Sequence, residues 1–277
     1  MRIQKFFELV FGRILYAFFS LKFVKFMMFR LVLNSGLDSA FSKGPTSEQL
    51  RWQGYCLLNQ GRSVAQLQQD LWVLYRLKGL GGGWFVDVGA CNPKYLSNTF
   101  LLETDFGWNG LLIEPSPESV QLLRKFRKCA VIPVAISSKS SVKLEIAIEP
   151  EFNTTNAADQ KHHRLFKTSG RTIRVEGSTL SKVFVMNCVP DDFEYLSIDC
   201  EGDELEVLKT NDWLRFKPKL ISVNHNFRSD RVSVRRLLEG EGYILDPINS
   251  QFSWDAWYLL PEVLEDRGTE YMASGRI

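Results

Sequence analysis

Two short apolar runs on either side of a helical stretch constrain most strongly what this chain can fold into. Residues 85–88 read Phe-Val-Asp-Val and lead into Gly89, and residues 111–114 read Leu-Leu-Ile-Glu. Runs of this length and apolarity suit strands that are buried on both faces, as in a parallel sheet. The segment between them is long enough for a crossover helix. Residues 83–115 therefore predict a strand–helix–strand unit of an α/β protein.

The acidic residues at the ends of these two strands indicate what the unit binds. Ligands of open α/β sheets bind at the carboxyl ends of the strands, and an acid roughly 20 to 27 positions after the loop can accept hydrogen bonds from a ribose. Glu114 stands at such a position, and Asp87 can meet an amino group of the ligand. The unit is therefore predicted to bind a nucleoside-containing cofactor.

The loop after the first strand distinguishes between cofactors. A dinucleotide site needs the pattern G-x-G-x-x-G, which lets the backbone approach a pyrophosphate at a helix N-terminus. Residues 89–94 read Gly-Ala-Cys-Asn-Pro-Lys and hold a single glycine. S-adenosylmethionine carries a ribose and an adenine without a phosphate, so it needs only the tight turn and the ribose acid. We therefore expect S-adenosylmethionine rather than a nicotinamide cofactor.

Strands and helices alternate along the rest of the chain, which predicts a parallel sheet with helices on both faces. Alternating apolar residues over 142–148 predict a strand open on one side, and residues 171–175 are expected to pair with it. The polar segment 151–170, with His162 and His163, is expected to shape a substrate pocket. Two capping boxes predict the starts of leading helices. The remaining predicted strands are 130–136, 195–199, 220–224, 243–245 and 256–260. The predicted helices are 117–128, 204–209 and 232–240, and the two capping boxes are at 46–49 and 63–66.

The first 33 residues differ from the rest in charge and composition. They carry six basic side chains against one acidic one, and eight of the twenty Phe residues. A basic, aromatic helix of this kind suits the surface of an anionic membrane, and the alternative is a helix packed on the domain or on a second subunit. Its longest uncharged run, residues 14–21, is too short to span a bilayer, and no signal-peptide cleavage site follows it. Residues 34–277 hold 28 basic and 31 acidic side chains, so they lack the basic surplus of a nucleic-acid binder.

These features predict one main domain with an appendage. We expect a basic helical segment over 1–33, a linker and leading helices over 34–78, the main domain over 79–262 and a tail over 263–277. The five cysteines show no CxxC pair and are interpreted as reduced thiols. The protein is therefore expected in the cytoplasm, with peripheral contact at the inner face of a membrane through residues 1–33.

Six phrases, in this order and at this spacing, resemble the FkbM family of methyltransferases. They are Ser-Val-Ala-Gln-Leu-Gln-Gln-Asp-Leu-Trp-Val-Leu (63–74), Phe-Val-Asp-Val-Gly-Ala (85–90), Leu-Ser-Asn-Thr (96–99), Gly-Trp-Asn-Gly-Leu-Leu-Ile-Glu-Pro (107–115), Tyr-Leu-Ser-Ile-Asp-Cys-Glu-Gly-Asp-Glu (195–204) and Asp-Ala-Trp-Tyr (255–258). The resemblance implies a class I methyltransferase fold, which is a Rossmann-like, mostly parallel seven-stranded sheet with helices on both faces. It also implies methyl transfer from S-adenosylmethionine, usually to a hydroxyl oxygen of a sugar or natural product.

Two positions depart from the family pattern. Pro93 stands where many members have Gly, which stiffens the loop and removes an N–H. Asn224 stands where Glu before His-Asn is common. The missing carboxylate puts acceptor binding, metal use and activity in doubt.

The residues expected to bind the cofactor surround the first two strands. The alternative for Ser97, Asn98 and Thr99 is that they cap a helix. We expect direct contact from Asp87, Gly89, Ala90, Asn92 and Glu114, support of the loop by Asn98 and Thr99, and backbone contact with the adenine at Ala135 and Ile136.

The acceptor is expected near the ends of the strands at 195–199 and 220–224. Positioning its oxygen near the methyl group supplies much of the rate, and a nearby base removes its proton. His225 is the preferred base because its ordinary pKa suits work near neutrality, and the alternative is a structural histidine. Asp199 and Glu201 are expected to position the acceptor. A metal site of these two acids with His225 is the alternative, and no metal is predicted.

The chain is thus predicted to be an S-adenosylmethionine-dependent O-methyltransferase that acts on a hydroxyl of a sugar, glycan or related metabolite. One alternative is a nicotinamide-dependent oxidoreductase, which the low glycine count disfavours. The other is a catalytically degenerate methyltransferase fold that serves as a scaffold at a membrane, which Asn224 keeps open. The sequence identifies neither the acceptor nor the oligomeric state.

Overall fold

The computed structural model describes residues 46–147, 168–248 and 253–265. The predictions for residues 1–33, for most of the linker, for His162 and His163 and for most of the tail lie outside these ranges. No helix among the described residues is both long enough and apolar enough to cross a membrane.

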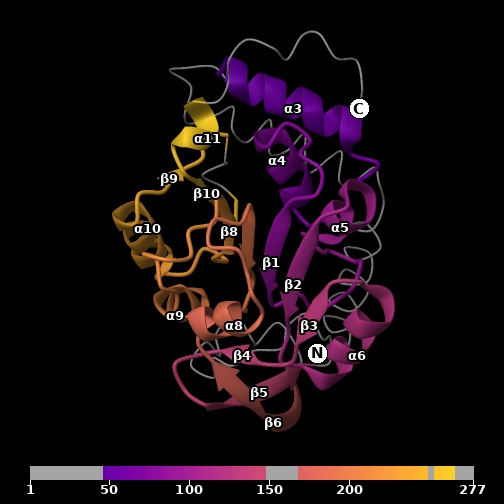
Figure 1. The fold of residues 1–277 in the computed structure, drawn as a ribbon, viewed down its shortest axis with the longest axis vertical. Helices are drawn as coiled ribbons and strands as arrows, with labels where there is room; N and C mark the ends of the chain where they lie inside the picture. Colours follow the sequence, from indigo (N-terminus) through magenta and orange to yellow (C-terminus); the bar gives the residue numbers. More distant parts are fainter. Residues whose placement is uncertain (1–45, 148–167, 249–252, 266–277) are drawn as a thin grey trace, which may run out of the picture. The chain divides into compact units, whose positions relative to one another are not determined.

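The main sheet has seven strands in the order β3-β2-β1-β7-β8-β10-β9 (Figure 1). Neighbouring strands are parallel from β3 to β8, whereas β10 is antiparallel to both β8 and β9. This mostly parallel sheet is the predicted class I methyltransferase fold. The strands are β1 Trp84–Val88, β2 Asn109–Ile113, β3 Ala130–Ile132, β7 Tyr195–Ile198, β8 Leu220–Asn224, β9 Ile244–Leu245 and β10 Asp255–Leu259.

Helices cover both faces of this sheet, as predicted. Side chains alternate between the faces along each strand, so Phe85 and its neighbour Val86 enter different cores. The core around Val86 packs against α8, α9 and α10, and the core around Phe85 packs against α4, α5 and α6. The helices are α3 Ser47–Asn59, α4 Gln69–Arg76, α5 Phe100–Phe106, α6 Pro117–Phe126, α8 Leu180–Met186, α9 Glu204–Lys209, α10 Arg231–Gly240 and α11 Glu262–Glu265.

The single strand predicted over residues 130–136 is wrong. The segment forms β3 in the main sheet and then β4 Ala135–Ile136, which belongs to a second sheet with the order β4-β6-β5. Pro133 lies between the two strands, and proline has no N–H to continue the ladder. The predicted pairing of the next two segments is confirmed, because β5 Ser141–Ala147 pairs antiparallel with β6 Thr168–Ser178.

The first predicted capping box is confirmed. The backbone N–H of Gln49 donates to Thr46 Oγ1 at 3.2 Å, and the N–H of Thr46 donates to Gln49 Oε1 at 2.9 Å. Each side chain therefore satisfies one N–H group at the start of α3.

The second predicted capping box, over residues 63–66, is wrong, because α4 begins only at Gln69. Ser63 Oγ donates its proton to Asp70 Oδ1 at 2.6 Å instead of accepting from the backbone. Ala65 forms a parallel bridge with Leu96. These residues thus form a loop that touches the segment after β1.

Candidate functional site

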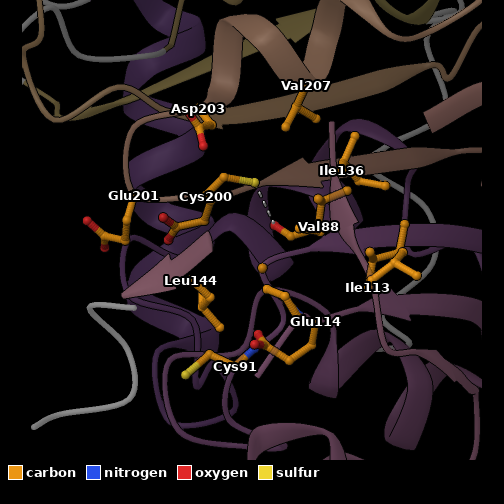
Figure 2. Close-up of a pocket in the computed structure, with 15 residues that line it drawn as sticks. Val88, Cys91, Ile113, Glu114, Ile136, Leu144, Cys200, Glu201, Asp203 and Val207 are labelled. Atoms are coloured by element: carbon orange, nitrogen blue, oxygen red, sulfur yellow. Dashed lines mark hydrogen bonds between the residues drawn. The ribbon is translucent and has the colours of Figure 1, made fainter. Parts of the chain in front are cut away.

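The carboxyl ends of β1, β2 and β7 meet at a pocket, and Figure 2 shows its lining. Its acids are Glu114, which follows β2, and Asp199, Glu201 and Asp203, which follow β7. No Lys or Arg occurs among the lining residues that the structure describes. In their ionised forms these acids favour a positively charged ligand. Its other lining residues are Val88, Gly89, Cys91, Ile113, Pro115, Val134, Ala135, Ile136, Leu144, Cys200 and Val207.

Gly89 allows the turn that ends β1 next to β7. Its φ is +85°, a conformation that favours glycine, and a Cβ placed there would lie 1.8 Å from the carbonyl oxygen of Asp199. Its N–H donates to the carbonyl of Ile113 at 2.9 Å, and that of Ala90 donates to the same carbonyl at 3.3 Å. Gly89 thus joins the ends of three neighbouring strands.

Glu114 connects the end of β2 to the loop after β1. Its Oε2 accepts from the N–H of Cys91 at 2.9 Å, and its Oε1 accepts from the N–H of Ser116 at 2.7 Å. Burial raises the pKa of Glu114 to about 7, although these two hydrogen bonds lower it. An ionised carboxylate has about four acceptor sites, so Glu114 keeps lone pairs for the hydroxyl groups of a ribose.

One of the loop residues expected to contact the cofactor, Asn92, forms hydrogen bonds within the loop instead. Asn92 Oδ1 accepts from the N–H groups of Lys94 and Tyr95 at 3.0 and 2.8 Å, which closes a turn. Neither Asn92 nor Ala90 is among the residues that line the pocket. Gly89, Glu114, Ala135 and Ile136 are the predicted cofactor residues that do line it.

Asp87 and Thr99 are buried and Asn98 is half-buried, and none of the three lines the pocket. Thr99 Oγ1 donates to Asp87 Oδ2 at 2.8 Å, and Asn98 Nδ2 donates to Ser197 Oγ at 3.0 Å. Thr99 holds the N-cap position of α5, but its side chain makes no capping hydrogen bond. Asn98 Oδ1 is buried with no partner among the described residues.

The loop after β7 is held in a strained conformation by Glu204. Glu204 Oε1 accepts from the N–H groups of Cys200 and Gly202 at 3.1 and 2.8 Å. Between them, Glu201 has a φ of +49°, which is unusual for a residue with a side chain. Burial, and then the charge of Asp199, raise the pKa of Glu201. Such strain and perturbed acids cluster at functional sites.

Asp199 and Asn224 lie next to each other on neighbouring strand ends. Burial and the charge of Asp255 raise the pKa of Asp199, while a hydrogen bond from Asn224 lowers it. Asn224 is in turn the register partner of Asp255 on β10. Asp199 Oδ1 and Asn224 Oδ1 are both buried with no partner among the described residues. Buried acceptor oxygens are usually hydrogen-bonded, so a ligand that donates hydrogen bonds would satisfy these two.

His225 does not line the pocket. Its Nδ1 accepts from the N–H of Phe227 at 3.1 Å, which assigns the proton of the neutral ring to Nε2. Burial, and then the charge of Arg231, lower the pKa of His225. In this arrangement the ring holds a turn in which Asn226 and Phe227 have φ values of +42° and +55°. Its role as a base stays a prediction.

Within the ranges that the structure covers, no three His, Cys, Asp or Glu side chains are grouped so that they could hold a metal ion. The alternative metal site of Asp199, Glu201 and His225 is therefore not assembled here. Sequence reasoning missed Glu204 as the residue that shapes the loop, although it ends the family phrase at 195–204. It also missed Arg127, a buried arginine that donates to Pro93, Ser97 and Thr99 in the segment after β1, because the basic segment around it is typical of an exposed helix.

The chain is similar to one known protein family and to several solved structures. The sequence profile described as "Methyltransferase FkbM domain" matches residues 87–245. No curated protein matches the chain. Among solved structures, a precorrin-6y C5,15-methyltransferase from Geobacter metallireducens is 12% identical, with a TM-score of 0.37 over 69% of this chain and 85% of its own. A putative caffeoyl-CoA O-methyltransferase from Staphylococcus aureus is also 12% identical, with a TM-score of 0.39 over 83% of this chain and 96% of its own.

A third solved structure, an O-methyltransferase from Bacillus cereus in complex with SAH, is 12% identical, with a TM-score of 0.38 over 78% of this chain and 92% of its own. The profile match covers more than half of the 277 residues. It includes Asp87, Glu114 and the whole loop after β7. The chain belongs to the FkbM family of S-adenosylmethionine-dependent methyltransferases.

Proposed function

We propose that this protein transfers the methyl group of S-adenosylmethionine to a hydroxyl oxygen of a sugar, glycan or related metabolite. The observation that carries the proposal is the acid-lined pocket in which Gly89 and Glu114 meet Asp199. Two features support a hydroxyl acceptor: the unpaired Asp199 Oδ1, which can receive a proton, and the neighbouring Asn224 Oδ1, which can receive a second hydrogen bond.

The lining of the pocket fits S-adenosylmethionine better than a dinucleotide. The bound cofactor supplies a methyl group on a positively charged sulfur. Four acids line the pocket without a Lys or Arg among the described lining residues. Burial raises the pKa of all four, so each favours the positive sulfur to the extent that it is ionised. In the ionised form the same acids would repel a pyrophosphate. This supports a methyltransferase over the oxidoreductase alternative.

Each part of the pocket has a role in holding the cofactor. Glu114 accepts hydrogen bonds from the ribose hydroxyls, because its two backbone contacts leave acceptor sites unused. The turn at Gly89 lets the main chain approach closely. Ala135 and Ile136 of β4 offer apolar and backbone contacts to the adenine.

Asp199 is the base that the geometry favours. Its pKa is raised by burial and by Asp255, so its carboxylate is more basic than an exposed one and better matched to neutral pH. Asn224 donates to it without adding a third negative charge beside Asp199 and Asp255. The amide at position 224 is thus compatible with catalysis, which weighs against the scaffold alternative.

Calorimetry with the full chain and S-adenosylmethionine at pH 8 tests the cofactor. We expect saturable binding that Glu114→Gln weakens about 10- to 100-fold, because a hydrogen bond to a charged group contributes about 1.5–3 kcal/mol. Glu239→Gln, which removes an exposed carboxylate of α10, serves as the control. Absence of saturable binding by the wild-type protein would contradict the proposed function.

The acceptor is tested with methyl-labelled S-adenosylmethionine and a panel of sugars and glycans. Transfer that disappears when one hydroxyl is replaced by hydrogen identifies the site of methylation. Binding of the cofactor without transfer to any member of the panel would favour the scaffold alternative.

We also propose that residues 1–33 hold the protein at a membrane. Their six basic side chains and eight Phe residues support contact with anionic lipids. The full chain should float with vesicles that contain phosphatidylserine and remain behind with vesicles of phosphatidylcholine alone. Equal behaviour with both kinds of vesicle would contradict this proposal.

A further inference from the structure

A buried arginine lies under the loop between β1 and α5. Arg127 directly follows α6, and 6% of its surface is exposed. Its guanidinium forms an ion pair with Glu103 of α5. Glu103 Oε1 also accepts from the N–H groups of Lys128 and Cys129 at 2.6 and 3.0 Å. The ion pair is therefore part of a junction that joins α5 to the segment before β3.

The same guanidinium holds the loop at three points. Nη1 donates to the carbonyl of Pro93 at 3.3 Å and to Ser97 Oγ at 3.2 Å, and Nη2 donates to Thr99 Oγ1 at 3.1 Å. The loop runs from Gly89 to Thr99, and Gly89 and Cys91 within it line the pocket. Because Arg127 presents a rigid planar fork, these contacts define where the loop lies.

Thr99 connects Arg127 to Asp87. The hydroxyl of Thr99 accepts from Arg127 and donates its own proton to Asp87 Oδ2 at 2.8 Å. Ser197 on β7 also forms a hydrogen bond with Asp87. Burial raises the pKa of Asp87, and the Thr99 hydrogen bond, the charge of Arg127 and the Ser197 hydrogen bond lower it.

We propose that Arg127 is a positioning residue for the methyl donor, which holds the loop between Gly89 and Thr99 in place and acts through Thr99 on the carboxylate of Asp87. The inference rests on the proposed function, since it assumes that the pocket binds S-adenosylmethionine. Arg127 itself is not among the residues that line the pocket. Arg127 therefore affects a cationic ligand indirectly, through the position of the loop and through the negative charge of Asp87.

Other charged and titratable groups face Asp87 from the surrounding elements. These groups are Glu114 at the end of β2, Cys129 before β3, and Tyr195 and Asp199 on and after β7. The Arg127 variants also affect Cys129 and the ion-pair partner Glu103, because burial raises the pKa of each and Arg127 lowers it. Variants of Thr99 keep Arg127 and both of these groups in place.

The test is the pH dependence of the dissociation constant for S-adenosylmethionine, measured by calorimetry on the full chain from pH 5 to 8.5. Arg127→Met should weaken binding, and the loss should grow as the pH falls, because Asp87 without the arginine is protonated at a higher pH. A shift of one unit in that pKa corresponds to about a 10-fold loss in the affected range. Arg127→Lys keeps the positive charge but loses the planar guanidinium. Compared with Arg127→Met, it should therefore bring the pH dependence of binding back towards the wild type, while the affinity at high pH stays below that of the wild type.

A second pair of variants tests the connection through Thr99. Thr99→Val removes the hydroxyl, so binding of S-adenosylmethionine should begin to weaken at a higher pH, as with Arg127→Met. Thr99→Ser keeps the hydroxyl and should keep the pH dependence of the wild type. If Arg127→Met does not fold, this pair still tests the proposal, since Arg127 and its ion pair with Glu103 remain in place.

Arg76 provides a matched control. It is also buried in an ion pair, with Asp246, and it lies away from the pocket lining. Arg76→Met should lower the free energy of unfolding and leave the pH profile of binding unchanged. If Arg127→Met weakens binding equally at every pH, or leaves it unchanged, Arg127 is structural and the inference is wrong. If the wild-type protein does not bind S-adenosylmethionine, the proposed function fails instead.

Discussion

At the scale of single residues, the pocket depends on how closely β1 and β7 approach each other at Gly89. Gly89→Ala would place a methyl group 1.8 Å from the carbonyl oxygen of Asp199 in a backbone conformation with φ +85°. We expect the loop to move and binding of S-adenosylmethionine to fall at least about 100-fold, measured by calorimetry and equal to about 2.7 kcal/mol. Gly79→Ala is the control, because Gly79 has a similar φ of +70° with nothing within 4 Å of the added methyl.

A second prediction at this scale separates the two candidate bases. Asp199→Asn should lower kcat by about 100-fold or more and change the dissociation constant of the cofactor little, since a positioned base contributes about 10²–10⁴. His225→Gln should lower kcat less, because the Nδ1 of His225 is already used by the N–H of Phe227. Single-turnover kinetics with an identified acceptor provide the measurement. A larger loss of kcat in His225→Gln than in Asp199→Asn would identify His225 as the base instead.

At the scale of helices and strands, the sequence predicts the apolar elements well and the polar connections poorly. Strand β8 and helix α9 match their predicted ranges, because their apolar positions are bounded by turns and charged residues. The prediction of one strand over residues 130–136 is wrong because Pro133 interrupts the strand. The junction at Arg127 is not predictable from local pattern, because its partners come from positions 93 to 103 and meet only in the folded chain.

The loop before α4 gives a prediction at this scale. Asp70 accepts from Ser63 Oγ and from the N–H of Val64, at 2.6 and 3.3 Å. Asp70→Asn turns one acceptor into a donor, so it should lower the free energy of unfolding by about 1–3 kcal/mol and speed hydrogen exchange over residues 63–68. Asp105→Asn, at an exposed ion pair with Arg62, should change stability by less than about 0.5 kcal/mol. Urea denaturation measures both, and equal effects would contradict the proposed role of Asp70.

At the scale of the whole molecule, the buried acids link stability to pH. An acid whose pKa is raised holds its proton more tightly in the folded chain, so the free energy of unfolding falls as the pH rises between the unfolded and folded pKa values. Burial raises the pKa of each of these acids: to about 6 for Asp70, and to about 7 for Glu114, Glu204 and Asp255. The pH window runs from about 4 to about 6 for Asp70 and from about 4 to about 7 for the other three. His225 and Glu103, whose pKa values are lowered, act in the opposite direction.

The protein without cofactor should therefore be less stable at pH 7.5 than at pH 5. Each raised acid contributes up to about 1.4 kcal/mol per pH unit within its window, and urea denaturation at a series of pH values measures the sum. Added S-adenosylmethionine should stabilise the protein more at pH 7.5, because binding then meets ionised carboxylates. A free energy of unfolding that rises from pH 5 to 7.5 would contradict the predicted burial of these groups.

The position of β10 has a consequence for how the protein is made. In sequence β10 follows β9, yet in the sheet it lies between β8 and β9. Its first residue, Asp255, accepts from Gln69 Nε2 at 3.1 Å, across 186 positions of the chain. A nascent chain that ends before residue 255 can form the β1–β2 unit but not this edge of the sheet. The pocket proposed for the methyl donor, whose last lining residue is Val207, can thus form before β10 has emerged, whereas the proposed acceptor side beside Asp199 and Asn224 is completed only after β10 has emerged.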